Sequence, residues 1–415
     1  MIKRILLIIL IAIAFSTPTI VHAQENISVL DNSTENQFPS ALVFKLKVES
    51  SSDITDIRLN YQVEKMNLAK VISEAWPQFI SSPSVETQWI WDMRNSSLPP
   101  SAIVHYWWII EDKSGKKLTT PATTIHFNDN RYPWQSLSSE KLTLFYYEDN
   151  QSMAKELLTA AEQALERLAS DTGVYLENPV EIYIYANSKD LQGSMIFPRE
   201  WTGGVAFTQY SIIAIGISSY NLSWGKNALA HELGHMVTHQ LTFSPYGANL
   251  PTWLDEGLAM HAEGQLDDNL QSYLKKAIER QDLISIRSLC SPFSAISEEA
   301  YLSYAESQSV VEFLIKNYGN NEISNLLDLL KDGHSIDEAL IEIYGVDQDG
   351  LDQLWQEELT PPILEKPELQ EKKTLHPAII SLLSALATLA ALALALGLQE
   401  WTYRRYKRKV LTSKH

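Results

Sequence analysis

Apolar and polar side chains alternate along much of residues 41–127, in short stretches that turn-forming residues separate. Alternation with a period of two is typical of strands that bury one face. The predicted strands cover residues 41–50, 55–65, 102–112 and 116–127. Several such strands in succession predict an all-β sandwich of immunoglobulin or fibronectin type III character at residues 24–130. We expect this domain to act as a spacer or docking module.

The pattern changes after residues 128–134, which are rich in turn formers and which we interpret as a linker. From residue 138 onward, strand-like stretches alternate with longer segments that have the 3.6-residue period of helices. Strands are predicted at 141–149, 180–186, 203–207 and 211–217, and helices at 152–169, 267–281, 297–317, 322–331, 335–344 and 349–358. Residues 138–360 are therefore predicted to form an α+β domain with a sheet lobe and a helical lobe.

Two segments between these lobes contain candidate metal ligands. His231 and His235 stand four residues apart, a spacing that places both imidazoles on one face of a helix, off its apolar face. Glu232 projects beside them, where a carboxylate can take a proton from an activated water. A catalytic zinc site needs a third protein ligand. We expect this ligand to be Glu256, on a second helix that Thr252 caps.

Together the two segments resemble a known family. HExxH followed, after a twenty-residue spacer, by the glutamate of WLDEG is similar to the gluzincin zinc metallopeptidases. Aminopeptidase N-like members have asparagine where Asp255 stands and a slightly shorter spacer, so the chain more closely resembles the peptidase MA-like proteins. The resemblance covers residues 138–360 and implies a thermolysin-like fold that holds one Zn²⁺ ion per chain.

The resemblance also implies roles for individual residues. The zinc ligands would be His231, His235 and Glu256, and Glu232 would be the general base. Glu263, which the family pattern also shows, would hold a ligand histidine in its tautomer, and Asp255 is expected beside the ligands as well. A surface position is the alternative for Glu263. His239 and His261 are expected to be packed or exposed histidines and not ligands.

These enzymes add a hydrogen-bond donor, often a tyrosine, that stabilises the developing oxyanion. The segment that begins at Tyr304, YAES, resembles a tyrosine-containing helix of the peptidase MA-like family. Tyr304 is therefore the candidate donor, and Tyr301 is the second choice. The alternative is that Tyr304 is a tyrosine packed inside the helical lobe.

A glycine-led stretch precedes His231 at the distance where gluzincin aminopeptidases carry GGMEN or GAMEN. It consists of Gly203, Gly204, Val205, Ala206 and Phe207. Glycines let a substrate backbone approach closely, and this strand could pair with an extended peptide. Ala206 takes the place of the glutamate that binds a free amine in aminopeptidases. The stretch therefore predicts an endopeptidase, unless a loop acid such as Glu200 replaces that glutamate.

Both ends of the chain carry targeting signals. Residues 1–23 combine two basic residues, an apolar run and a small-residue cleavage site, as a secretory signal peptide does. Residues 377–399 include 21 uncharged positions, 378–398, enough to cross a bilayer, although a buried core helix is the alternative. The basic residues at 400–415 predict a cytoplasmic tail, and the proline- and charge-rich stretch 361–376 predicts a stalk. We expect a single-pass cell-membrane protein with its catalytic domain outside the cytoplasm.

Net charge and cysteine content limit the kinds of partner and the source that the sequence suggests. A net charge of −18 argues against a nucleic-acid partner. Cys290 is the only cysteine, so no intrachain disulfide can form, which in an exported protein favours a bacterial source. The sequence predicts a membrane-anchored zinc peptidase with a peptide or protein substrate. The alternatives are a catalytically inactive scaffold that binds a surface partner and an aminopeptidase, and the oligomeric state stays open.

Overall fold

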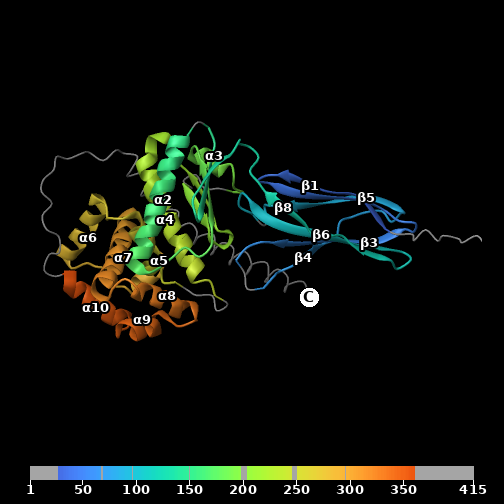
Figure 1. The fold of residues 1–415 in the computed structure, drawn as a ribbon. Coiled ribbons are helices and arrows are strands. Elements are labelled where there is room, and N and C mark those ends of the chain that lie inside the picture. The colour runs from blue at the N-terminus through green and yellow to red at the C-terminus, as the bar shows by residue number, and fades with distance from the viewer. Residues whose placement is uncertain are drawn as a thin grey trace, which may run out of the picture.

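The computed structural model describes residues 27–66, 69–95, 97–148, 150–197, 203–244, 250–294 and 296–359. The predicted signal peptide, stalk, membrane helix and basic tail all lie outside these residues, as does Glu200. Within the described part of the chain, no helix is both long and apolar enough to cross a membrane. Figure 1 shows a sheet-rich unit on one side and a mostly helical unit on the other.

The N-terminal unit consists of two antiparallel sheets, as the alternating pattern predicts. The first sheet has the order β1 (Ser28–Gln37), β2 (Ala41–Glu49), β5 (Ser84–Asp92). The second sheet has the order β4 (Ser73–Ala75), β3 (Ile54–Val63), β6 (Ala102–Asp112), β7 (Lys117–Thr119). Strand β8 (Thr123–Phe127) also pairs with β6. Every second residue of β6 is buried. The buried faces meet in an aromatic core, in which the Phe44 ring lies 4.9 Å from that of Tyr106.

Strands β1, β4 and β5 have no counterpart among the predicted strands. The sequence of β1, SVLDNSTENQ, is almost entirely polar, and all of its residues are exposed or half-buried. Its pairing with β2 along nearly its whole length holds it in place. The indole N–H of Trp108 on β6 also donates to Asn32 Oδ1 at 3.0 Å, so β1 is tied to the second sheet as well.

The second unit begins with a five-stranded sheet, followed by helices. The sheet has the order β12 (Gly204–Phe207), β13 (Ile212–Gly216), β11 (Val180–Tyr185), β10 (Leu142–Tyr146), β9 (Gln135–Ser138). The three central strands are parallel, and β9 and β12 pair antiparallel at the edges. Helix α2 (Gln151–Thr172) packs against β10 and β9, and the short α3 (Ser188–Gln192) packs against β13 and β11.

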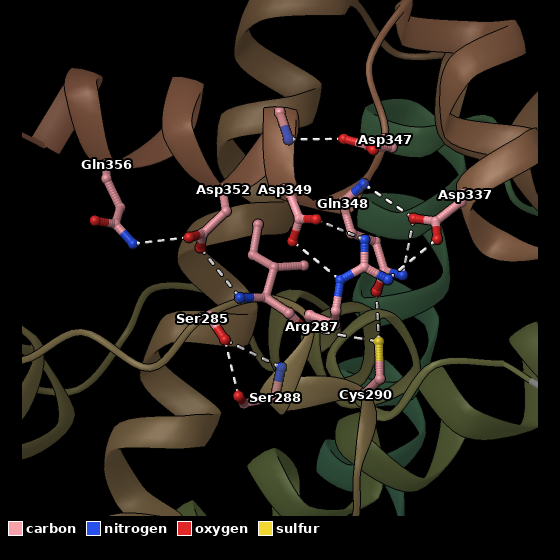
Figure 2. A network of polar contacts seen from close by, with 12 residues as sticks. Ser285, Arg287, Ser288, Cys290, Asp337, Asp347, Gln348, Asp349, Asp352 and Gln356 are labelled. Carbon is pink, nitrogen blue, oxygen red and sulfur yellow. Dashed lines mark hydrogen bonds and ion pairs between the residues drawn. The ribbon is translucent and has the colours of Figure 1, made fainter.

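Among the described residues, seven helices complete this unit: the two that carry the candidate metal ligands and five whose positions match the predicted helical lobe. They are α4 (Leu222–Leu241), α5 (Thr252–Glu263), α6 (Asp268–Arg280), α7 (Ser297–Tyr318), α8 (Glu322–Lys331), α9 (Ile336–Tyr344) and α10 (Gln348–Leu359), with 3₁₀ turns at Thr208–Tyr210, Ser219–Asn221 and Ser288–Cys290. The last two helices are tied to the 3₁₀ turn before α7 by a polar network (Figure 2). Its centre is Arg287, which bonds both Asp337 of α9 and Asp349 of α10.

The two units are in contact through the segment between them and through the loop around β12. The predicted linker, residues 128–134, is packed: the buried Asp129 carboxylate accepts bonds from Arg131 and from the Tyr185 hydroxyl. In addition, the Met66 backbone N–H donates to the Gln209 carbonyl at 2.7 Å. The sandwich is therefore attached to the sheet lobe by bonds as well as by the chain itself.

Candidate metal centre

Helix α4 carries both candidate histidines and lies at the centre of the second unit. It packs against α2, α5 and β12, so it is covered on several sides. For this reason His231 is only 6% exposed, although the periodicity predicts that it lies off the buried face of a helix. The polar face of α4 can be buried because polar side chains of neighbouring elements contact it.

Two glycines allow the helix that carries Glu256 to come close enough. A Cβ atom at Gly234 would lie 2.6 Å from the Ala259 Cα atom on α5, and one at Gly257 would lie 2.5 Å from the Ser307 carbonyl oxygen on α7. Neither distance is tolerable, so α4, α5 and α7 can pack this closely only with glycine at both positions. Helix α5 does begin at Thr252, but the Thr252 hydroxyl donates to the Cys290 carbonyl and does not cap the helix.

The three predicted ligands converge. The Nε2 atoms of His231 and His235 are 3.2 Å apart, and Glu256 Oε2 lies 3.3 Å from the first and 3.6 Å from the second. Two ligands about 2.0–2.1 Å from a tetrahedral zinc ion stand roughly 3.3 Å apart. The three donor atoms thus have the mutual spacing that such an ion requires.

Carboxylates engage the opposite nitrogen of each imidazole. His231 Nδ1 lies 2.8 Å from Glu263 Oε1, and His235 Nδ1 lies 3.1 Å from Asp255 Oδ1. A carboxylate acceptor favours the ring proton on Nδ1, so a neutral imidazole at either position leaves its Nε2 available to bind a cation. Meanwhile Glu256 Oε2 is buried without a hydrogen-bond partner. Two Nε2 atoms and a buried carboxylate oxygen without a hydrogen-bond partner are a donor set that fits a divalent cation and zinc in particular.

The same carboxylates control the charge of the imidazoles when no metal neutralises the site. Burial alone would lower the pKa of His235, but Asp255 and Glu256 outweigh it and raise the pKa to about 9. Burial alone would raise the pKa of Asp255, yet His235 and His239 hold it well below its usual range. Metal binding therefore competes with protons, because zinc requires both imidazoles to be neutral.

Glu232 lies next to these groups and against the edge strand β12. A Cβ atom at Gly204 would be 3.2 Å from Glu232 Oε1, so glycine leaves the space that this carboxylate occupies. Burial raises the pKa of Glu232, while His235, His231 and the backbone N–H of Ala206 partly offset the effect. A raised pKa makes the carboxylate a stronger base, as a group that accepts a proton from water must be.

Tyr304 is brought to the site by α7. Its ring centroid lies 6.3 Å from that of His231 and 5.1 Å from that of Phe293. Burial raises the pKa of Tyr304 well above its usual range, and Glu256 and Glu263 add to this effect. The hydroxyl therefore keeps its proton and can act as a donor. Tyr301 packs instead against Tyr273 on α6, with ring centroids 5.6 Å apart.

The predicted substrate strand, Gly203 to Ala206, lies along the site at the edge of the sheet. Val205 and Ala206 pair with β13, and the other edge of β12 has no partner strand among the described residues. Gly203 lies over the Trp224 ring, where an added Cβ atom would make an ordinary 3.5 Å contact. An extended peptide could thus approach β12 closely.

One contact was not predicted. Asp255 Oδ2 lies 3.2 Å from His239 Nε2, so Asp255 bridges His235 and His239. The spacing of four residues between the two histidines was the signal in the sequence, but it does not say which carboxylate would reach them. The other extra histidine, His261, pairs with Asp171 on α2 and does not approach the donor atoms.

Comparison with known proteins bears on the second unit. Residues 160–361 match the model of the Peptidase MA superfamily. No curated protein matches the chain.

Solved structures with similarity to the chain include the following three. An M1 zinc metallopeptidase from Deinococcus radiodurans is 12% identical, with a TM-score of 0.34, and the match covers 84% of this chain and 97% of that one. An aminopeptidase N family protein from Idiomarina loihiensis is 10% identical, with a TM-score of 0.27 and coverage of 77% and 68%. The third, a catalytically inactive OgpA from Akkermansia muciniphila bound to an O-glycopeptide, is 10% identical, with a TM-score of 0.20; the match covers 26% of this chain and 30% of that one. These TM-scores are too low to add to what the family model indicates.

Proposed function

We propose that the protein is a zinc-dependent peptidase, because residues 160–361 match the model of the Peptidase MA superfamily. The observation that carries the proposal is the convergence of three donor atoms. His231 Nε2, His235 Nε2 and Glu256 Oε2 lie 3.2 to 3.6 Å from one another. Two Nε2 atoms whose opposite ring nitrogens contact carboxylates, beside a buried carboxylate oxygen without a hydrogen-bond partner, form a donor set that suits zinc.

Zinc in this position would supply a Lewis acid and a water of lowered pKa. The chain supplies the rest of the chemistry. Glu232, oriented by the Ala206 N–H, accepts the proton of the attacking water and can pass it to the leaving amine. The Tyr304 hydroxyl, kept protonated by burial, donates to the oxyanion that develops on the substrate carbonyl. Strand β12 holds the substrate in an extended form.

The experiment separates metal binding from catalysis. In Glu232→Gln the zinc content should stay at one equivalent, because the side chain is not a ligand. Peptide hydrolysis should fall at least about a hundredfold, because the base is gone. His235→Ala and Glu256→Ala should lose the metal as well. Wild-type protein that holds no zinc after dialysis would favour the inactive scaffold, and near wild-type cleavage by Glu232→Gln would remove its assignment as the base.

The proposed enzyme cleaves bonds in the interior of a peptide and needs no free amino terminus. Ala206 cannot bind an ammonium group, so a free amino terminus gains nothing at this position of β12. A matched pair of peptides, one with a free and one with an acetylated amine, tests this. Both should be cleaved at similar rates. Loss of cleavage on acetylation would assign the protein to the aminopeptidases.

We also propose that the enzyme is anchored at the cell membrane by residues 377–399. The support comes from the uncharged run and from the basic residues that follow it. Protease added to intact cells should digest residues 24–376 and spare the tail at 400–415. Protection of the catalytic domain would reverse the proposed orientation.

A further inference from the structure

His239 is a histidine that the proposed reaction does not use. It lies on α4, one turn after His235, and its side chain is 41% exposed, whereas those of Asp255 and His235 are 21% and 18% exposed. The three side chains form a row from solvent to the metal centre. Its two links are the 3.2 Å contact of His239 Nε2 with Asp255 Oδ2 and the 3.1 Å contact of Asp255 Oδ1 with His235 Nδ1.

We propose that His239 is a positioning residue that holds the Asp255 carboxylate in the orientation in which it fixes His235 for zinc. This inference rests on the proposed zinc site. Each oxygen of Asp255 has one histidine partner, so the carboxylate is held at both ends. Without His239, Oδ2 would face water and the carboxylate could rotate about its Cβ–Cγ bond. Rotation would move Oδ1 away from the Nδ1–H group that sets the His235 tautomer.

A second metal ion is the competing explanation, because donor atoms of His235, His239 and Asp255 also lie within 4.8 Å of one another. His235 would have to give Nδ1 to that ion while Nε2 serves the first. An imidazole that bridges two ions must lose both ring protons, whereas the Asp255 oxygen 3.1 Å from Nδ1 can accept a hydrogen bond only if Nδ1 keeps its proton. The positioning role needs no such step.

The consequence is measurable in metal release. Partners that orient metal-binding histidines typically change metal affinity by about 10- to 100-fold. His239 acts one contact further out, so His239→Ala should speed zinc transfer to a chelator by roughly the lower of these values, about tenfold. His239→Gln, which keeps an N–H donor at a similar reach, should restore most of the wild-type rate.

Two controls and a second readout make the result specific. His105→Ala removes a comparable exposed pair, His105 Nε2 to Glu64 at 3.1 Å, from the sandwich and should leave zinc release unchanged. In an Asp255→Asn background, His239→Ala should add little to the rate, since His239 acts through that carboxylate. Cobalt substitution gives a second readout: the visible spectrum of the Co²⁺ form should change in His239→Ala and return in His239→Gln.

The outcomes distinguish this inference from the proposed function. If the wild-type protein binds no zinc, the proposed function itself fails. If it binds one equivalent and His239→Ala releases zinc at the wild-type rate with an unchanged cobalt spectrum, only the role of His239 is wrong. Two equivalents in the wild type that fall to one in His239→Ala would establish the second metal ion instead.

Discussion

The sandwich and the metal-bearing helices achieve close packing in opposite ways. In the sandwich, large side chains fill the space between two sheets: Phe44 is completely buried, and its ring lies 5.7 Å from that of Trp89. Around the metal centre, the absence of side chains at Gly234 and Gly257 lets three helices pack in direct contact. The first arrangement gains stability from apolar burial. In the second arrangement, the close approach of the helices brings ionisable groups together. Such a core depends on the positions of the backbones more than on side-chain volume.

The largest effect on stability is expected from Phe44→Ala in the sandwich. Removing a buried aromatic ring typically costs about 3–5 kcal/mol. The core around Phe44 is separate from the core that contains α4 and α5, so zinc binding should persist. Urea unfolding followed by near-ultraviolet circular dichroism, together with zinc content, checks both statements. Ile90→Ala, at a 53% exposed position on the neighbouring strand, is the matched control and should change stability by less than about 0.5 kcal/mol. Loss of zinc in Phe44→Ala would mean that the two cores are not independent.

A smaller loss of stability, but a direct effect on the metal, is expected from Gly257→Ala. The new methyl group would meet the Ser307 carbonyl at 2.5 Å, and relieving that clash must move α5, which carries Glu256, and α7 apart. Overpacking typically costs about 1–3 kcal/mol. Zinc affinity should fall with it, as competition with a chelator would show. Gly203→Ala adds the same methyl group at an ordinary 3.5 Å contact and should change neither quantity much. Unchanged zinc affinity in Gly257→Ala would show that the close approach of α5 and α7 is not needed for the site.

The same contrast explains what could be read from the sequence. Alternation predicted β2, β3 and β6 because each buries one face. It could not predict β1, whose ten residues are mostly polar and are held by pairing with β2. For the metal centre, spacing placed His231 beside His235, and the need for a third ligand together with a helix start at WLDEG pointed to Glu256. The bridge from Asp255 to His239 depends on how closely two helices approach, and no periodic pattern in one helix contains that information.

The two regions also differ in how they bury acids. At the edge of the sandwich, the buried Asp129 is paired with Arg131. Glu306 on α7, in contrast, is fully buried and accepts only the Ile284 backbone N–H, with no basic side chain paired to it among the described residues. Burial first, and then Asp352 and Asp282, raise the pKa of Glu306 to about 9. A folded-state pKa above the unfolded value favours the native state at low pH, and this stabilisation is lost as the pH rises toward 9.

Glu306→Gln should therefore show the smallest effect of the three at pH 5 and a growing one above it. Glutamine keeps the oxygen that accepts the Ile284 N–H, but it cannot ionise. Near pH 5 the variant and the wild type should differ by less than about 1 kcal/mol, since a shift of one pKa unit corresponds to about 1.4 kcal/mol. From pH 5 to 9 the wild type should lose stability relative to the variant, by at most about 1.4 kcal/mol per pH unit. Urea unfolding across this range measures the difference. Parallel pH profiles for the two proteins would mean that Glu306 is not held in its protonated form.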